Sequence, residues 1–203
     1  MSGSIHKSAP PHAGSTAYIN ARIVDPGGDA EYRGAVLISD GKIADFGPNL
    51  FASGAPYGIE SIDCRGLCLA PGIVDTRVHT GEPGEEHKET LESAGAAAAV
   101  GGITSMVLLP DNEPPFDDAS LIEFVARRAR QIKLVNMYAY GALTVGLEGK
   151  ELAEIGLLAE AGAVAFTDAD HAVANAQVMR RALYYAKPFD ALIVHLPQER
   201  SEE

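Results

Sequence analysis

Residues 69–118, LAPGIVDTRVHTGEPGEEHKETLESAGAAAAVGGITSMVLLPDNEPPFDD, decide the fold of this chain. Short apolar runs with β-branched residues predict strands at 69–79 and 103–110, and the longer Ala-rich run between them predicts a helix over 87–101. A strand, a helix and a second strand at this spacing are typical of parallel βα units with right-handed crossovers. The stretch therefore indicates an α/β fold.

The same alternation continues toward the C-terminus. It predicts helices over 117–131, 149–162 and 175–187, and strands over 133–143, 163–168 and 191–196. Residues 70–203 then hold strands 1 to 5, the first half of a (β/α)8 TIM barrel, which by itself takes about 250 residues. Because an open half-barrel leaves strand edges unpaired, we expect a longer parent protein or a second chain that supplies the missing half.

The region before the barrel has a different pattern of apolar and turn residues. Residues 17–69 contain short apolar runs cut by turn residues, with a strong hairpin signal at Asp40-Gly41, and predict the N-terminal part of a small β-sandwich domain. Cys64 and Cys68 are predicted on one strand, as buried free thiols rather than a metal-binding pair. Residues 1–16, rich in Ser, Pro, Gly and Ala, predict a flexible tail.

Composition narrows the functional classes. The 203 residues are 46% hydrophobic and carry a net charge of −12 without a cluster of Lys or Arg, which makes a nucleic acid or an anionic membrane an improbable partner. The sequence has no long apolar run and no secretory signal pattern, so a cytoplasmic location is expected. Small molecules or other proteins are the partners left to consider.

Two blocks of the sequence resemble a known enzyme family. Residues 69–118 resemble the first two βα units of type I dihydroorotases, relatives of allantoinase and dihydropyrimidinase in the amidohydrolase superfamily. Residues 141–170, GALTVGLEGKELAEIGLLAEAGAVAFTDAD, resemble the third and fourth units. The resemblance implies a barrel whose C-terminal mouth binds zinc and activates water to open or close a cyclic amide. It also implies that the protein assembles as an oligomer.

The metal positions implied by the resemblance are mostly altered. The strand 1 pair of His is Arg77 and His79 here, and a guanidinium has no lone pair to offer a cation, so His79 is a vestigial candidate ligand. The bridging Asp of strand 4 falls on Ala169. Its neighbour Asp168 could replace it only by turning toward the other face of the strand. The strand 5 His falls on Leu196 in an ungapped alignment or on His195 with one gap, and both registers stay open.

The substrate positions are altered too. Gly81 stands where the family has an Arg that grips the substrate carboxylate. Asp111 stands at the position of a substrate-binding Asn, which leaves the adjacent Asn112 as a candidate substrate-binding residue. Asp111 and Asn112 can equally be turn residues before a proline. The family's later ligand His and catalytic Asp would lie beyond residue 203.

These losses favour a non-catalytic relative that resembles the degenerate dihydroorotase homologues of bacteria. It would have no catalytic residue and no cofactor, although active relatives use zinc, and it would act as a structural partner of aspartate carbamoyltransferase. The alternative is an active zinc-dependent cyclic amidohydrolase in which His79, His195, Asp168 and Asp170 form a relocated site. A third hypothesis is that Arg77 replaces the metal charge and forms salt bridges with nearby carboxylates.

Overall fold

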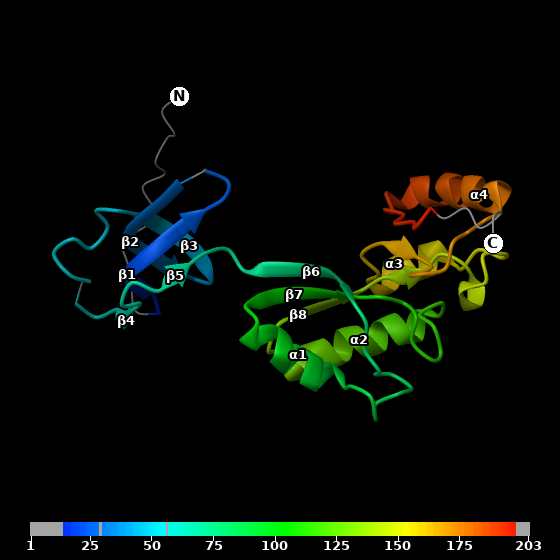
Figure 1. The fold of residues 1–203 in the computed structure, drawn as a ribbon, viewed down its shortest axis with the longest axis horizontal. Coiled ribbons are helices and arrows are strands. Elements are labelled where there is room, and N and C mark those ends of the chain that lie inside the picture. Colours follow the sequence, from blue (N-terminus) through cyan, green and yellow to red (C-terminus); the bar gives the residue numbers. More distant parts are fainter. Residues whose placement is uncertain (1–13, 29, 56, 198–203) are drawn as a thin grey trace. The chain divides into compact units, whose positions relative to one another are not determined.

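The fold is described from a computed structural model, for residues 14–28, 30–55 and 57–197. The chain divides into two compact units, Met1–Pro71 and Gly72–Glu203, each described here by itself (Figure 1). Most of the predicted tail over residues 1–16 lies outside the described residues. In the described residues, no helix is long and apolar enough to cross a bilayer.

The first unit is a five-stranded sheet. Strands β1 (Thr16–Asp25), β2 (Ala30–Ser39) and β3 (Lys42–Gly47) form an antiparallel meander, while β4 (Glu60–Asp63) and β5 (Cys68–Leu69) both pair parallel to β1. The predicted hairpin is confirmed, because Asp40 and Gly41 have φ values of 52° and 71° between β2 and β3. The small core of the first unit is formed by Ala21, Ile23 and Val36.

The prediction that both cysteines lie on one strand is wrong. Cys64 follows the end of β4 and Cys68 begins β5. Arg65 and Gly66, with φ values of 49° and 81°, form a turn between these two strands. Both thiols are free, as predicted, but Cys64 is only partly buried and Cys68 is exposed.

The second unit is built from parallel βα units. Strands β6 (Ile73–Val78), β7 (Ile103–Leu108) and β8 (Asn136–Ala139) form one sheet, and β9 (Gly141–Ala142) and β10 (Phe166–Thr167) form a parallel pair beyond it. Figure 1 shows that α1 (Leu91–Val100) and α2 (Ala119–Ile132) lie on one side of the sheet. The rest of the unit consists of η1 (Val145–Leu147), α3 (Ile155–Ala161), α4 (Ala176–Ala186) and η2 (Lys187–Phe189).

One core joins these elements. Its largest fully buried side chains come from the strands, from the loops after β7 and β9 and from the helices: Leu91, Met106, Leu108, Phe116, Ile122, Leu143, Ile155, Leu158 and Phe166. On α2 the buried residues Ile122 and Val125 lie three apart, as an amphipathic helix requires. The buried side of α2 therefore follows the helical period.

Element boundaries differ from the predictions in ways that local chemistry explains. Helix α1 begins at Leu91 because Thr90 accepts a hydrogen bond from the Ser93 N–H in a capping box, so the prediction that His87 opens this helix is wrong. The predicted strand over 133–143 is divided into β8 and β9. The predicted fifth strand makes one bridge, between Ile193 and Phe166. It has a strand neighbour on that one side in the described residues.

Candidate functional site at the strand ends

The carboxyl ends of the parallel strands bring the predicted site residues into one region. In a βα barrel this end carries the functional groups, because the loops after successive strands meet there. The relevant side chains follow or end β6, β7 and β10: Arg77, His79, Asp111, Asn112, Asp168 and Asp170. Their contacts decide what this region can bind.

Arg77 is paired with a carboxylate. Its Nη2 donates to Oδ1 of Asp170, and both side chains are about half exposed, at 50% and 59%. The pair joins the end of β6 to the loop after β10, two segments that are 93 residues apart in the sequence. A guanidinium therefore stands where the resemblance implies the first metal ligand, and it engages one of the carboxylates that the relocated metal site would need.

His79 is engaged in the same way. Its Nδ1 lies 2.7 Å from Oδ2 of Asp111, which joins the end of β6 to the loop after β7. The imidazole is 54% exposed, whereas the Asp111 side chain is 24% exposed. This contact therefore uses one ring nitrogen of His79 and one carboxylate oxygen of Asp111.

The carboxylate of Asp168 is bonded to the loop after β9 and not to the other candidate metal ligands. Its side chain is buried, with Oδ1 accepting from the backbone N–H groups of Leu143 and Thr144 at 3.0 and 2.9 Å, and Oδ2 accepting from the Thr144 hydroxyl at 2.5 Å. Burial raises the pKa of Asp168 above its ordinary value, although these three hydrogen bonds act in the opposite direction. Both oxygens are therefore used to fix the loop that begins at the end of β9.

Ala169 occupies the bridging position with a methyl group. It is 2% exposed and packs in a small apolar cluster with Val107, Leu109, Tyr140 and Ala165. Its φ of 53° places the backbone in the left-handed region. This position presents no electron-pair donor from its side chain.

The two registers of strand 5 fall on neighbouring residues of the described chain. His195 is partly buried and Leu196 is 43% exposed, just after the bridge at Ile193. Over residues 14–28, 30–55 and 57–197, no group of three or more His, Cys, Asp or Glu side chains is arranged to hold a metal ion. The degeneracy of the zinc site stays a prediction.

Asn112 is part of a loop contact. It is 7% exposed, and its Nδ2 donates to the carbonyl oxygens of Thr80 and Pro83 at 3.1 and 3.3 Å. Its Oδ1 is buried and has no hydrogen-bond partner among the residues that the structure describes. The amide therefore fixes the loop after β6, and its assignment as a substrate-binding residue stays a prediction.

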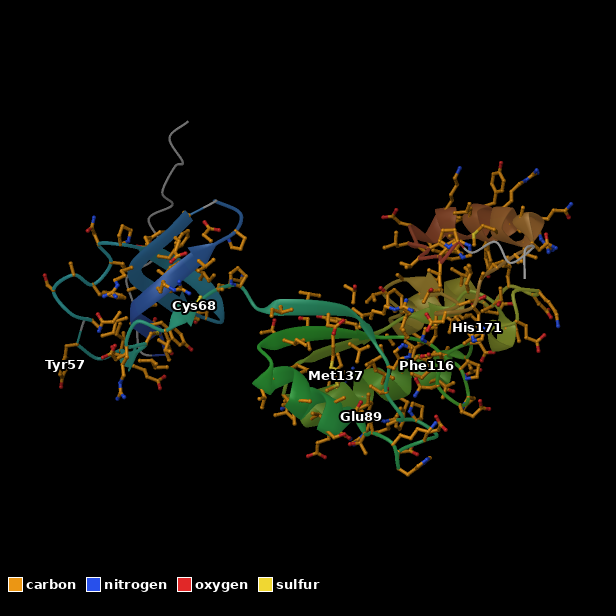
Figure 2. All side chains as sticks on the ribbon, in the orientation of Figure 1. Tyr57, Cys68, Glu89, Phe116, Met137 and His171 are labelled. Carbon is orange, nitrogen blue, oxygen red and sulfur yellow. The ribbon has the colours of Figure 1, made fainter. Side chains whose placement is uncertain are left out.

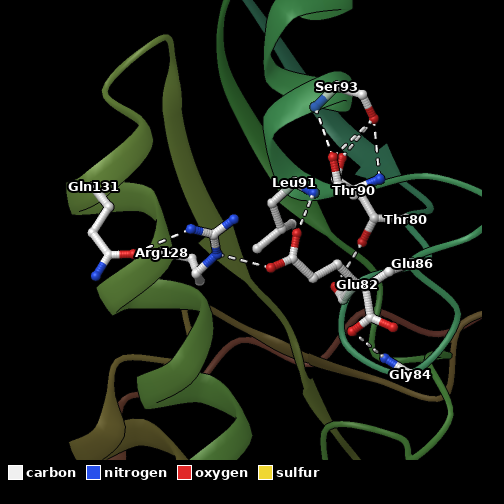
Figure 3. A network of polar contacts seen from close by, with 9 residues as sticks. All are labelled: Thr80, Glu82, Gly84, Glu86, Thr90, Leu91, Ser93, Arg128 and Gln131. Atoms are coloured by element: carbon white, nitrogen blue, oxygen red, sulfur yellow. Dashed lines mark hydrogen bonds and ion pairs between the residues drawn. The ribbon is translucent and has the colours of Figure 1, made fainter.

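A buried carboxylate that the sequence analysis missed organises the same loop. Glu82 is 5% exposed, and its Oε2 accepts from the N–H of Leu91 while its Oε1 accepts from Nε of Arg128, both at 2.8 Å (Figure 3). It links the first turn of α1 to α2. Arg128 lies 46 residues away in the sequence, so the pairing could not be deduced from the sequence.

Comparison with known proteins identifies the family. Residues 66–200 match the dihydro-orotase-like family. The chain is 45% identical over 171 residues to a dihydroorotase of Wolbachia sp. subsp. Brugia malayi, a match that covers 84% of this chain and 38% of that protein. It is 44% identical over 184 residues to a dihydroorotase of Ehrlichia chaffeensis, covering 90% and 41%. The chain thus spans about two fifths of the length of these relatives.

Solved structures agree with this assignment. A D-hydantoinase is 25% identical, with a TM-score of 0.66 over 88% of this chain and 39% of that protein. The L-hydantoinase of Arthrobacter aurescens is 27% identical, with a TM-score of 0.59 over 75% and 32%. The second unit is accordingly the first half of an amidohydrolase-type (β/α) barrel, as predicted. The chain belongs to the dihydro-orotase-like family.

Proposed function

We propose that this chain is a dihydroorotase-like protein of pyrimidine biosynthesis that has lost catalysis. It works in the cytoplasm as a structural partner of an aspartate carbamoyltransferase-type subunit, in an oligomeric assembly. The family assignment supports the pathway, because the named relatives are dihydroorotases. The contacts at the strand ends support the loss of catalysis.

The ion pair between Arg77 and Asp170 is the observation that carries the proposal. A metal ion needs several electron-pair donors converging on one point, and Arg77 supplies a fixed positive charge where such a donor would stand. That charge would repel a divalent cation brought close to it. Even the loss of residues that only support metal ligands weakens metal binding about tenfold or more, and here ligand positions themselves are replaced.

The alternative of an active enzyme with relocated ligands requires several contacts to break together. Asp168 would have to leave three hydrogen bonds, and Asp170 would have to leave Arg77. His79 would also have to turn from Asp111. The contacts favour the third hypothesis instead, in which Arg77 takes over the role of a cation in joining the strand ends.

Co-purification and turnover test the proposal together. The purified chain should co-elute with the catalytic subunit of an aspartate carbamoyltransferase in size-exclusion chromatography with light scattering. It should not convert dihydroorotate, with or without added zinc. The Ehrlichia chaffeensis dihydroorotase is the positive control for turnover. Zinc-dependent turnover by this chain would overturn the proposed loss of catalysis, and failure to co-elute would overturn the proposed partner.

A further inference from the structure

A pocket of about 630 Å³ lies in the first unit, between the sheet and the connection from β3 to β4. These two strands are at opposite ends of the strand order β3-β2-β1-β4, so residues 48–59 have to pass β2 and β1. Pro48, Leu50 and Phe51 of the connection line one side of the pocket, while residues of β1 and β2 line the other. Tyr57, later in the same connection, points into solvent (Figure 2). The pocket is therefore formed by segments of one unit.

The pocket and the small core of the first unit lie on opposite faces of the sheet. Successive residues of a strand point to opposite faces. On β2, Tyr32 and Val36 belong to the core, whereas Arg33 and Ala35 line the pocket. The second sheet of a sandwich packs on the apolar core face. The pocket is thus on the other face, which the connection from β3 to β4 covers.

Two guanidinium groups line this pocket. Arg33 is exposed on β2, and Arg65 lies in the turn between β4 and β5; among the described residues, neither forms a salt bridge. Asp63 is the one carboxylate among the described lining residues, and its Oδ1 accepts from the Arg65 N–H and from Nδ2 of Asn20, both at 2.9 Å. The lining therefore carries one more positive than negative charge, in a chain whose net charge is −12.

Phe51 gives the pocket an aromatic side chain on a strained turn. Its φ of 59° lies in the left-handed region, which is unfavourable for a residue with a Cβ. The Gly54 N–H donates to the carbonyl oxygen of Phe51 at 2.8 Å and closes this turn. Strained backbone of this kind persists where the surrounding structure requires it, and it is common at ligand sites. The turn therefore holds Phe51 in the lining of the pocket.

We propose that this pocket binds an organic phosphate, with the phosphate between Arg33 and Arg65 and the organic group against Phe51. A guanidinium binds phosphate oxygens through two parallel N–H donors. The pocket volume lies in the range of sites for whole small molecules, which favours a phosphate that carries an organic group. The pocket contains none of the strand-end residues, so this binding is independent of the proposed loss of catalysis.

Isothermal titration calorimetry of the purified chain with phenyl phosphate tests the proposal. We expect one site per chain and binding that weakens with salt. Arg33→Gln and Arg65→Gln each remove one guanidinium and should weaken binding about tenfold or more. Asp63→Asn removes the opposing charge but keeps an oxygen that can accept both hydrogen bonds, so it should tighten binding. Circular dichroism checks that the variants fold.

Arg127→Gln is the matched control. It removes the same charge from an exposed Arg of α2 that does not line the pocket, and it should bind phenyl phosphate like the unchanged protein. Benzoate, which lacks the phosphate, and inorganic phosphate, which lacks the ring, should both bind more weakly. No binding of phenyl phosphate, an equal loss in Arg127→Gln, or weaker binding by Asp63→Asn would overturn the proposal. Equal binding of benzoate or of inorganic phosphate would also overturn it, since the pocket would not select an organic phosphate.

Discussion

Two buried carboxylates hold the loops around the strand ends, and they do so in different ways. Glu82 pairs with a cation, Arg128, and with a helix N–H, whereas Asp168 accepts hydrogen bonds from neutral groups and has no cation among its hydrogen-bond partners. Burial raises the pKa of Asp168 more than its hydrogen bonds and the nearby His171 lower it. We therefore make a separate prediction for each of the two carboxylates.

Replacement of Glu82 by Gln should lower the free energy of unfolding by about 3 kcal/mol, because it leaves the Arg128 guanidinium without its partner in a mostly buried contact. Glu85→Gln is the control, since Glu85 pairs with Lys88 in an exposed contact whose loss should cost less than about 1 kcal/mol. Urea denaturation of the two variants provides the measurement. Equal losses would contradict the role assigned to Glu82.

The raised pKa of Asp168 predicts a pH dependence of stability. The folded state holds this proton more tightly than the unfolded state, whose Asp pKa is near 3.8, so the contribution to stability falls as pH rises from 3.8 through the raised value. Asp168→Asn should lack this fall, since an amide oxygen still accepts from the two N–H groups and its NH2 can donate to Thr144. Denaturation of both proteins across this pH range measures the free energy of unfolding of each. Parallel curves of this free energy against pH would exclude the effect assigned to Asp168.

Arg77→His should cost no more than about 1 kcal/mol, because the ion pair with Asp170 is half exposed and screened by water. It restores one family ligand but leaves Ala169 without a donor. We therefore expect a small loss of thermal stability and no gain of zinc affinity, measured by a melting curve with and without zinc. A rise in melting temperature on adding zinc would show that the strand ends still assemble a site.

At the scale of elements, the loops after β6 and β7 lie in direct contact. Gly84, with φ of +107°, approaches so closely that a Cβ there would overlap the backbone carbonyl of Glu113. Asn112 ties the same two loops through the carbonyls of Thr80 and Pro83. The mouth of the half-barrel is thus held by loop-to-loop contacts as well as by its ion pairs.

Gly84→Ala should destabilise the protein by about 3 kcal/mol or more, because a blocked backbone adds to the cost of a positive φ. Gly102 offers a matched control. It has φ of +79° but open space around it, so Gly102→Ala should cost only the backbone term of about 1 kcal/mol. Thermal denaturation compares them, and similar losses would mean that the contact with Glu113 is not tight in solution.

Sequence reasoning predicted these elements well where local chemistry determines them. Asp40-Gly41 encodes its own turn, and the alternation of apolar runs predicted the order of strands and helices in the second unit. It failed where a partner distant in sequence decides, as with Glu82 and Arg128. It also placed the start of the first helix four residues too early, since Thr90 competes as a cap.

The candidate site shows the same division. Reading the residue types was enough to see that Arg77 and Ala169 cannot supply ligands. The pairing of Arg77 with Asp170, and of His79 with Asp111, depends on how the strand ends meet in space. The sequence analysis predicted that Arg77 forms salt bridges with nearby carboxylates, but it could not identify Asp170 as the partner.

The chain covers about two fifths of its dihydroorotase relatives. Within that part, the fold of the family is kept while the strand-end side chains are engaged with one another. The exposed apolar residues along β6, Ile73 at 57% and Val74 at 58%, lie where a further strand would pair. The proposed loss of catalysis therefore concerns the strand-end side chains and leaves the fold unchanged.

Zinc content tests the central claim most directly. The purified 203-residue chain is equilibrated with zinc, passed through a desalting column and measured by elemental analysis, with the Ehrlichia chaffeensis dihydroorotase treated in parallel. We predict far less than one zinc per chain, and no change after Arg77→Ala. One zinc retained per chain, lost when His79 and Asp168 are replaced together, would contradict it.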